Sequence, residues 1–448
     1  MQASISACVL PSVGSLLDGS INKTPRFGEG VDEVASSEGS ALSEQGKEKE
    51  KIITEGWLEG SAFQIAFVSL CLATALVPVA PKFEFSGQLY MTIIASLTIY
   101  VGSHRSLKGQ LPSKMTLKNS FAVPFFSSAV LFGFWCLLKY FPDLDLKVVL
   151  KSYLFLVGTI AVGSNVGEPL ARLLQPLAAI KTSITFPKWL IQDQGEAVTS
   201  DVRATDFLAA AIGIVISVIN VFPDAPYSVN NFIAICLVSE LLQTLSLGSF
   251  VTAAALLAGL LCYDVFWVFG SPSVIGDNVM VTVATSKSFL SSPMMLQFPV
   301  LNPGPSGRGF TILGLGDITV PGLLIALALR FDRYRNSNSN EGTGEASTSN
   351  REGASGWEWL DSIDDKTYFR TCLAAYCVGL GVTFVANSFS GAAQPALLYL
   401  VPAVLCGGSL AAVQRGEFRA VLDYKDRAGM EEAVPEPIEV VDSDKLLK

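Results

Sequence analysis

The chain has 448 residues, of which 50% are hydrophobic and only 16% charged, and its formal net charge at pH 7 is -9. Soluble domains usually carry about 25% charged residues, so this composition predicts a polytopic membrane protein and excludes an ordinary soluble enzyme. The acidic balance argues against a nucleic-acid partner. His104 is the only histidine, which argues against a histidine-based triad or a histidine-rich metal site.

The cysteines do not suggest a disulfide or zinc framework. Seven of the eight lie within apolar segments, where a cysteine is best interpreted as a small packing residue. These are Cys71, Cys136, Cys236, Cys262, Cys372, Cys377 and Cys406. The sequence implies no metal and no organic cofactor, so any catalysis must come from carboxylates, hydroxyls or amines.

The chain begins with a polar region and continues with apolar segments. Residues 1–60 are rich in Ser, Gly and Glu, which predicts a disordered region. Ten apolar segments follow, and most approach the roughly 20 residues that a helix needs to span a bilayer. They are Ser61–Val79, Gln88–Ser103, Phe121–Phe141, Val148–Val166, Asp206–Phe222, Val229–Leu247, Val251–Gly270, Phe310–Leu329, Tyr368–Ala386 and Ala392–Val413. We therefore predict an all-α polytopic membrane protein.

Charged loops between these segments indicate the orientation. The stretch 104–120 contains four basic residues and no acid, which is typical of a cytosolic loop. Counting spans from there places Arg330, Arg333 and Arg335 in the cytosol as well. The two counts agree, so we expect the 271–309 loop outside the cytosol and the C-terminus inside it. They do not decide whether the 61–79 segment crosses the membrane or is re-entrant.

Two aspartates stand alone in long apolar segments. Asp264 is the only charge within about 251–270, and Asp317 is the only charge within about 310–329. An ionised carboxylate at the bilayer centre costs several kcal/mol, so such a residue usually faces a partner or a water-filled cavity. We predict that both aspartates lie deep inside neighbouring antiparallel helices and share one site.

Two carboxylates that meet can hydrolyse a peptide bond by sharing one proton. One deprotonates a water molecule while its protonated partner donates to the carbonyl oxygen. Like charges a few ångströms apart resist double ionisation, so the pair titrates as a unit. Gly314 and Gly316 remove side chains just before Asp317, which permits close backbone approach and a local departure from helix geometry. Taken alone, the aspartates fit a proton or cation pathway in a transporter equally well.

A third motif, in residues 393–399, opens the last apolar segment with the sequence Ala-Gln-Pro-Ala-Leu-Leu-Tyr. Proline in the first turn of a helix is ordinary by itself. The order Tyr-Asp, Gly-Leu-Gly-Asp and Pro-Ala-Leu, each on a separate predicted span, is highly specific. It resembles the signal peptide peptidase family of intramembrane aspartyl proteases, relatives of presenilin, in a plant- or algal-like form. The resemblance runs from about Leu89 to Val413 and is closest from Ser239 to Phe331.

The resemblance implies a bundle of nine core transmembrane helices in the endoplasmic reticulum membrane, with a lumenal N-terminus and a cytosolic C-terminus. The 61–79 segment is then one extra N-terminal apolar segment, and the loop charges agree if it is not a full span. Other endomembranes and plastids remain alternatives.

The implied activity is that of an aspartic endopeptidase. It uses water to cleave peptide bonds within transmembrane segments, such as signal-peptide remnants and type II or tail-anchored proteins. Its partners would be these substrates and the lipid bilayer. Whether the chain forms a homo-oligomer or joins a degradation complex stays open.

The resemblance also implies roles for particular residues. Asp264 and Asp317 are the catalytic pair. Tyr263, beside the first aspartate, would orient that acid or the substrate, or would serve only as a packing aromatic. The residues expected to shape the active-site backbone or line the substrate cleft are Gly314, Gly316, Pro395, Ala396 and Leu397.

The resulting organisation has four parts: a disordered region at 1–60, N-terminal transmembrane helices at 61–247, a catalytic region at 248–413 and an acidic cytosolic tail at 414–448. The catalytic region is expected to contain a flexible linker at 336–356. Residues 271–277 look like an insertion after the Tyr-Asp helix that could alter the lumenal mouth of the cleft. For Glu240, a third acid in an apolar segment, a structural hydrogen-bonded role is favoured over a catalytic one.

Overall fold

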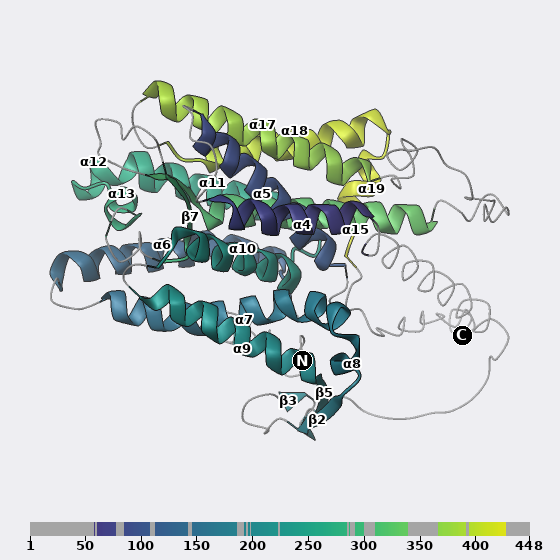
Figure 1. Ribbon diagram of the computed structural model, residues 1–448. Helices are drawn as coiled ribbons and strands as arrows, with labels where there is room; N and C mark the ends of the chain where they lie inside the picture. The colour runs from purple at the N-terminus through teal and green to yellow at the C-terminus, as the bar shows by residue number, and fades with distance from the viewer. Residues whose placement is uncertain are drawn as a thin grey trace, which may run out of the picture.

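The computed structural model describes residues 58, 61–77, 85–107, 113–141, 146–185, 192–193, 196–197, 199–222, 225–284, 286, 292–299, 310–338, 366–390 and 394–426. The predicted disordered region up to residue 57 lies outside the described residues. So do the linker beyond residue 338 and the tail beyond residue 426. Within the described part, long helices lie side by side in a bundle (Figure 1). This confirms a mostly helical architecture.

The long helices follow the predicted apolar segments closely. In chain order they are α4 (Ser61–Ala75), α5 (Ser86–Arg105), α6 (Leu117–Tyr140), α7 (Leu146–Leu173), α9 (Ala204–Val221), α10 (Tyr227–Thr244), α11 (Phe250–Val265), α15 (Leu315–Asn338), α17 (Thr367–Ser390) and α18 (Leu397–Gln414). Among the described residues, six helical stretches are long and apolar enough to cross a membrane: α6, 148–173, α9, 250–275, α17 and α18. The protein is therefore a multi-pass membrane protein, and the count of nine core spans stays a prediction.

Helix α15 occupies the centre of the bundle, where it packs against α5, α10, α11, α17 and α18. Every residue from Leu323 to Leu329 is at most 3% exposed. The outer helices instead present large apolar side chains, such as Phe125 on α6, which is 78% exposed. An apolar surface of this kind needs a lipid environment, since in water it would promote aggregation.

The short elements lie mainly at the helix ends. Strands β1 (Ser113–Lys114) and β6 (Leu245–Ser246) pair in parallel, and β2 (Lys181–Thr185) pairs antiparallel with β5 (Thr199–Arg203). The remaining short elements are α8 (Gln175–Ala178), β3 (Gln192–Asp193), β4 (Glu196–Ala197), the π-helix η2 (Phe266–Gly270), α12 (Ser271–Ile275), α13 (Val279–Ala284) and α19 (Phe418–Asp423). The suspected insertion at 271–277 thus begins as a helical turn that continues the helix bearing Asp264.

One predicted helix is wrong over its first five residues. Strand β8 (Phe310–Gly314) pairs antiparallel with β7 (Met295–Pro299), and α15 begins only at Leu315. The apolar run 310–329 did not separate strand from helix by composition. The pairing with β7 makes these five residues a strand. Gly314, a poor helix former, is the last residue of that strand. At its other end α15 runs to Asn338, past the predicted end at Leu329.

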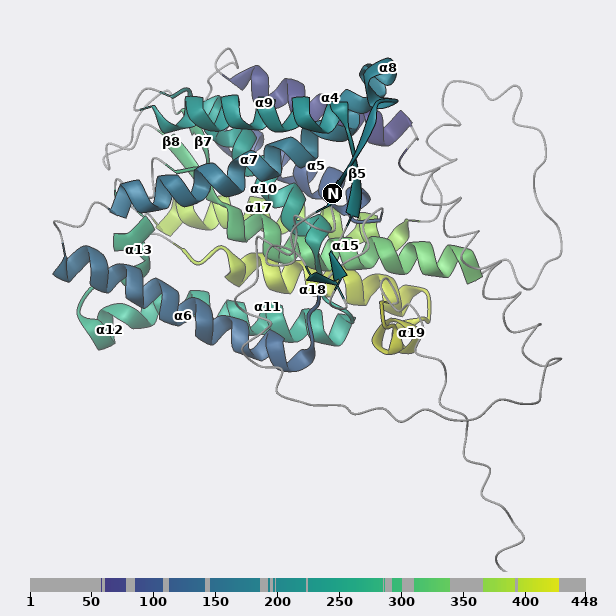
Figure 2. The ribbon, with the colours of Figure 1, turned by 90° about the horizontal axis from the view of Figure 1, so that it is seen from below.

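Figure 2, seen from below, shows α6 and α11 on one side of the bundle and α4 and α9 on the other. Helix α4, the extra N-terminal segment, packs against α5 and α10. The start of the predicted acidic tail is also folded onto the bundle, since Tyr424 and Asp426 after α19 are both buried.

Candidate active site

Asp264 lies within the helical stretch 250–275, as predicted, and its side chain is buried, with 3% of the residue exposed. The α-helical hydrogen bonding of α11 gives way to the π-helix η2 directly after it. Single π-helical turns are rare and occur frequently at functional sites. One carboxyl oxygen of Asp264, Oδ2, accepts a hydrogen bond of 3.2 Å from the backbone N–H of Leu397.

Asp317 does not lie deep inside a helix, contrary to the prediction. It sits in the first turn of α15, where it is half-buried, because the preceding residues form strand β8. The backbone of Gly314 hydrogen-bonds to its carboxyl group. This is one half of a capping box, in which an acid in the first turn satisfies the N–H group at the helix start. The partial positive charge of the helix N-terminus also favours a carboxylate here.

The two carboxyl groups come from helices that pack against each other, α11 and α15. They lie close enough to interact electrostatically. The structure therefore brings together the two aspartates that the sequence analysis assigned to one site. A carboxyl pair held at close range can keep one proton between its members, and this is the arrangement that acid–base hydrolysis needs.

The Pro-Ala-Leu motif reaches the same site through its backbone. Helix α18 begins at Leu397 with Ala396 as its N-cap, so Pro395 lies just before the helix and not in its first turn. The first N–H groups of a helix have no partner within it. The N–H of Leu397 is satisfied by Asp264 instead, which ties α18 to the carboxyl pair. Pro395 and Leu397 are buried, and Ala396 is half-buried.

Gly314 and Gly316 differ in what surrounds them. A Cβ atom at Gly314 would lie 3.3 Å from Oδ2 of Asp317, so this glycine allows the carboxyl group to fold back on the helix start. A Cβ atom at Gly316 would meet nothing within 4 Å, and Gly316 is exposed. The chain thus leaves open space beside Asp317.

Tyr263 is half-buried between two apolar clusters. One is the main core around α15, and the other joins α6, α7 and α13 through residues such as Trp135 and Trp267. This position fits the packing role, although its phenol also lies within electrostatic range of Asp264. The two roles considered for Tyr263, orienting the acid or the substrate and packing alone, both stay predictions.

A cavity of about 380 Å³ opens between α7, α10 and the start of α15. Leu315 and Gly316 form its wall next to Asp317, and Met294 and Pro293 line it from the start of the hairpin. The rest of the lining is mostly apolar, with Glu240 as its one acid. A cavity of this size is in the range of ligand pockets.

Glu240 is held by hydrogen bonding. Its carboxylate accepts a hydrogen bond from the hydroxyl of Ser164 on α7. The buried guanidinium of Arg105 lies within electrostatic range of it. Arg105 itself donates to the side chains of Asn165 and Ser239. This network fits the structural role that the sequence analysis favoured for Glu240.

The β7–β8 hairpin is fixed to α10 by a side-chain amide. Asn231 donates to the carbonyl of Gln297 at 2.8 Å and accepts from its N–H at 2.8 Å. The backbone groups of Gln297 therefore point away from β8. Ile312 is the partner of Gln297 in the register, and opposite residues in an antiparallel pair share the same type of hydrogen bonding. The N–H and C=O of Ile312 consequently face outward from β8, on an edge that no other described strand pairs with.

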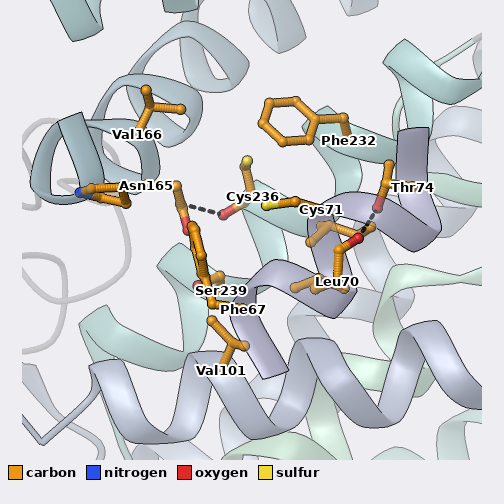
Figure 3. Close-up of a pocket in the computed structure, with 12 residues that line it drawn as sticks. Phe67, Leu70, Cys71, Thr74, Val101, Asn165, Val166, Phe232, Cys236 and Ser239 are labelled. Atoms are coloured by element: carbon orange, nitrogen blue, oxygen red, sulfur yellow. Dashed lines mark hydrogen bonds between the residues drawn. The ribbon is translucent and has the colours of Figure 1, made fainter. Parts of the chain in front are cut away.

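A second, smaller cavity of about 210 Å³ lies between α4, α5, α7 and α10 (Figure 3). Its lining is apolar except for groups such as Asn165, Ser239 and Thr74, and Asn165 donates to the carbonyl of Cys236 at 3.1 Å. It contains neither aspartate of the pair. Among the residues that the structure describes, no group of three or more His, Cys, Asp or Glu side chains is placed to hold a metal ion.

Sequence comparison identifies the family. The sequence profile of the signal peptide peptidase family matches residues 108–428. The chain belongs to the signal peptide peptidase family. It is 29% identical to signal peptide peptidase of Mus musculus over 373 residues, which cover 80% of this chain and 89% of the mouse protein. It is also 29% identical to signal peptide peptidase of Homo sapiens over 347 residues, covering 75% and 82% of the two chains.

A shorter region is similar to a paralogous group. Signal peptide peptidase-like 2B of Homo sapiens is 38% identical over 194 residues, or 41% of this chain and 28% of that protein. The family membership and the multi-pass architecture together make the protein an intramembrane aspartic protease. The matched region begins after α4 and α5, so α4 lies outside the family profile.

The sequence analysis missed one residue beside the site. Asn231 of α10 holds strand β7 through the backbone N–H and carbonyl of Gln297. Nothing in the sequence singled it out, because it lies within an apolar segment and outside the three motifs.

Proposed function

We propose that Asp264 and Asp317 are the catalytic dyad of this protease, and that they cleave substrates within their transmembrane segments. The observation that carries the proposal is the meeting of two isolated acids at the packed interface of α11 and α15, with the Leu397 N–H bonded to one of them. The family membership supplies the reaction class.

In the proposed reaction the dyad holds one proton. The ionised carboxylate removes a proton from water, whose oxygen attacks the carbonyl carbon of the scissile bond. The protonated carboxylic acid donates its proton to the carbonyl oxygen. The resulting tetrahedral diol collapses by breaking the C–N bond, and a proton passes from the dyad to the leaving amine.

The substrate must lose its helical structure before this can occur. A helix covers its carbonyl groups by hydrogen bonds, and unpaired backbone groups are costly within a bilayer. The outward-facing backbone of Ile312 on β8 is suited to pair with an unwound segment as an added strand. The open space at Gly316 and the 380 Å³ cavity beside it provide room for the side chains of that segment.

We infer a location in the endoplasmic reticulum membrane with the C-terminus in the cytosol. Arg333 and Arg335 lie near the end of α15, at the same end of the bundle as α19, whereas α12 and α13 lie at the opposite end (Figure 1). Basic residues flanking spans favour the cytosolic side. A glycosylation sequon introduced at 276–278 should therefore be modified in microsomes, and one introduced after residue 426 should not. The reverse pattern would contradict this orientation.

The reaction is tested with a purified transmembrane signal peptide in detergent. Wild-type protein should release two fragments whose masses place the cut inside the apolar segment, and Asp264→Ala and Asp317→Ala should release none. Asp423→Asn, which changes an exposed aspartate on α19, serves as the control and should cleave normally. Cleavage by either alanine variant at the wild-type rate would refute the dyad.

A further inference from the structure

Two consecutive asparagines of α10 bind the backbone of strand β7. Asn231, which is 0% exposed, donates to the carbonyl of Gln297 and accepts from its N–H, both at 2.8 Å. Asn230, which is 6% exposed, donates to the carbonyl of Met295 at 3.1 Å. Helices usually pack on strands through apolar side chains, and a buried amide is costly unless it is hydrogen-bonded. These two amides therefore do more than fill space.

The asparagines take the place of a third strand. Met295 and Gln297 are two residues apart on β7, and backbone groups two residues apart point to the same side of a strand. On its other side β7 pairs with β8. A strand edge offers its N–H and C=O groups to any added strand. Asn230 and Asn231 close this edge of β7, so the outer edge of β8 is the one that remains in the described two-stranded sheet.

The outer edge of β8 leads to Asp317. Gly314 is the register partner of Met295, whose bound carbonyl points away from β8. The backbone of Gly314 therefore points away from β7, as that of Ile312 does. Its hydrogen bond to the Asp317 carboxyl group agrees with this direction. A strand that paired with Ile312 would run along β8 toward one member of the proposed dyad.

The amide of Asn231 fixes the hairpin in a way that packing alone does not. Leu296 and Phe298 of β7 and Leu313 of β8 are at most 4% exposed and belong to the main core. Apolar burial is non-directional, so these side chains hold the depth of the hairpin but select its position along α10 only weakly. A pair of hydrogen bonds between one amide and one backbone residue is directional. It specifies that Gln297, and no other residue of β7, lies at Asn231.

We propose that Asn231, assisted by Asn230, is a positioning residue that fixes the β7–β8 hairpin at one place along α10, so that one peptide bond of a paired substrate faces the dyad. The inference rests on the proposed dyad and on strand addition at Ile312. Asn231 takes no part in bond making or breaking. Without it the hairpin shifts relative to the dyad, and the added strand meets the two aspartates at more than one bond.

The test is the distribution of cuts in a transmembrane peptide, read from product masses, together with kcat for Asn231→Leu. Leucine has the same branched shape and removes both hydrogen bonds. Titration with a tight-binding transition-state analogue counts active enzyme, so misfolded protein does not enter kcat. We expect kcat to fall about tenfold. The cuts should spread to bonds two residues to either side of the main site, because strand pairing repeats every two residues.

Asn230→Leu removes one longer hydrogen bond and should spread the cuts in the same way to a smaller extent. It also decides the question if Asn231→Leu forms no product. Gln243→Leu is the matched control. Gln243 lies about 18 Å further along α10, at a rise of about 1.5 Å per residue, and is 6% exposed. Its side-chain oxygen makes no hydrogen bond within the described part of the chain, so this variant should keep the wild-type cuts.

The wild-type distribution of cuts in both asparagine variants would overturn the proposal, whatever their kcat. Loosened packing alone lowers the rate without moving the cut. Two further variants separate this failure from failure of the proposed function. Cleavage by Asp317→Ala would overturn the dyad itself, and a wild-type rate in Ile312→Pro would overturn strand addition.

Discussion

The two ends of helix α15 are built for different tasks. At the N-terminal end, Asp317 is half-buried, Gly316 is exposed, and a cavity of about 380 Å³ lies beside them. At the C-terminal end, Arg330 forms an ion pair of 2.9 Å with Asp426, and both side chains are at most 1% exposed. We call the N-terminal end the open end, because it adjoins a cavity, and the region around Arg330 the closed end, because its charged side chains are buried.

The closed end also fixes the neighbouring helix. Asp332 accepts hydrogen bonds from the backbone N–H groups of Tyr368 and Phe369, at 3.3 and 2.8 Å, and so caps the start of α17 from outside. Phe331 packs edge-on against Tyr368 and Tyr424. A catalytic group keeps its geometry when it is mounted on rigid elements. The contrast suggests that the closed end holds α15 and α17 in place while the open end admits substrate.

The largest expected effect on stability comes from removing the buried ion pair at the closed end of α15. Arg330→Met would remove the cation of this buried ion pair while the carboxylate of Asp426 stays buried, which should lower the free energy of unfolding by about 3–5 kcal/mol. Denaturant or thermal unfolding in detergent measures the loss. The double variant Arg330→Met/Asp426→Leu should recover most of it, because both charges of the pair are then removed from the interior. A single variant as stable as wild type would contradict this description of the closed end.

The open end should respond in the opposite way. Gly316→Leu places a side chain into empty space, so thermal stability should stay near that of wild type. Cleavage should fall by about tenfold or more, because a displaced substrate loses its reacting geometry. Gly316→Ala, which adds one methyl group, should have a smaller effect. Normal turnover in Gly316→Leu would show that substrate does not pass this position.

The edge of β8 gives a sharper test of how substrate is held. Ile312→Pro removes an N–H that no described strand uses, and proline is tolerated on edge strands. We expect cleavage to fall by about tenfold, roughly the value of one or two backbone hydrogen bonds, with the fold preserved. Ile312→Val keeps the N–H and is the control. Equal cleavage by both variants would exclude strand addition at this edge.

A smaller effect is expected at the α17 cap. Asp332→Asn keeps one of the two carboxyl oxygens that accept from Tyr368 and Phe369, and it loses the charge that favours a helix N-terminus. The free energy of unfolding should fall by about 1 kcal/mol. Thermal unfolding of Asp332→Asn is compared with that of Arg330→Met. An equal loss of stability in the two variants would contradict the smaller effect expected at the cap.

The sequence predicted the elements whose signal is local. Asp264 and Asp317 were predicted as site residues because each is the only charge in an apolar run. Each long helix was predicted from its own apolar segment. The hairpin was not predicted, because it depends on contacts between residues far apart in the chain. These are the pairing of β7 with β8 and the hydrogen bond from Asn231 to Gln297. A short apolar run such as 310–314 fits a strand or a helix until its partner is known.

Contacts between residues far apart in the chain were not predicted either. Arg330 was assigned to the cytosolic side and Asp426 to an acidic cytosolic tail, and the buried ion pair that the two form was not foreseen. Such contacts require the tertiary structure, since neither residue carries a pattern along the sequence.

The most direct measurement of the central claim is the pH dependence of kcat/KM for cleavage of a transmembrane peptide by wild type, Asp264→Asn and Asp317→Asn. A dyad that shares one proton predicts a bell-shaped profile for the wild type, with the rate rising as the first proton leaves and falling as the second leaves. Each asparagine variant should give no product at any pH. A variant that keeps the wild-type rate and profile would show that its aspartate is not part of the catalytic pair.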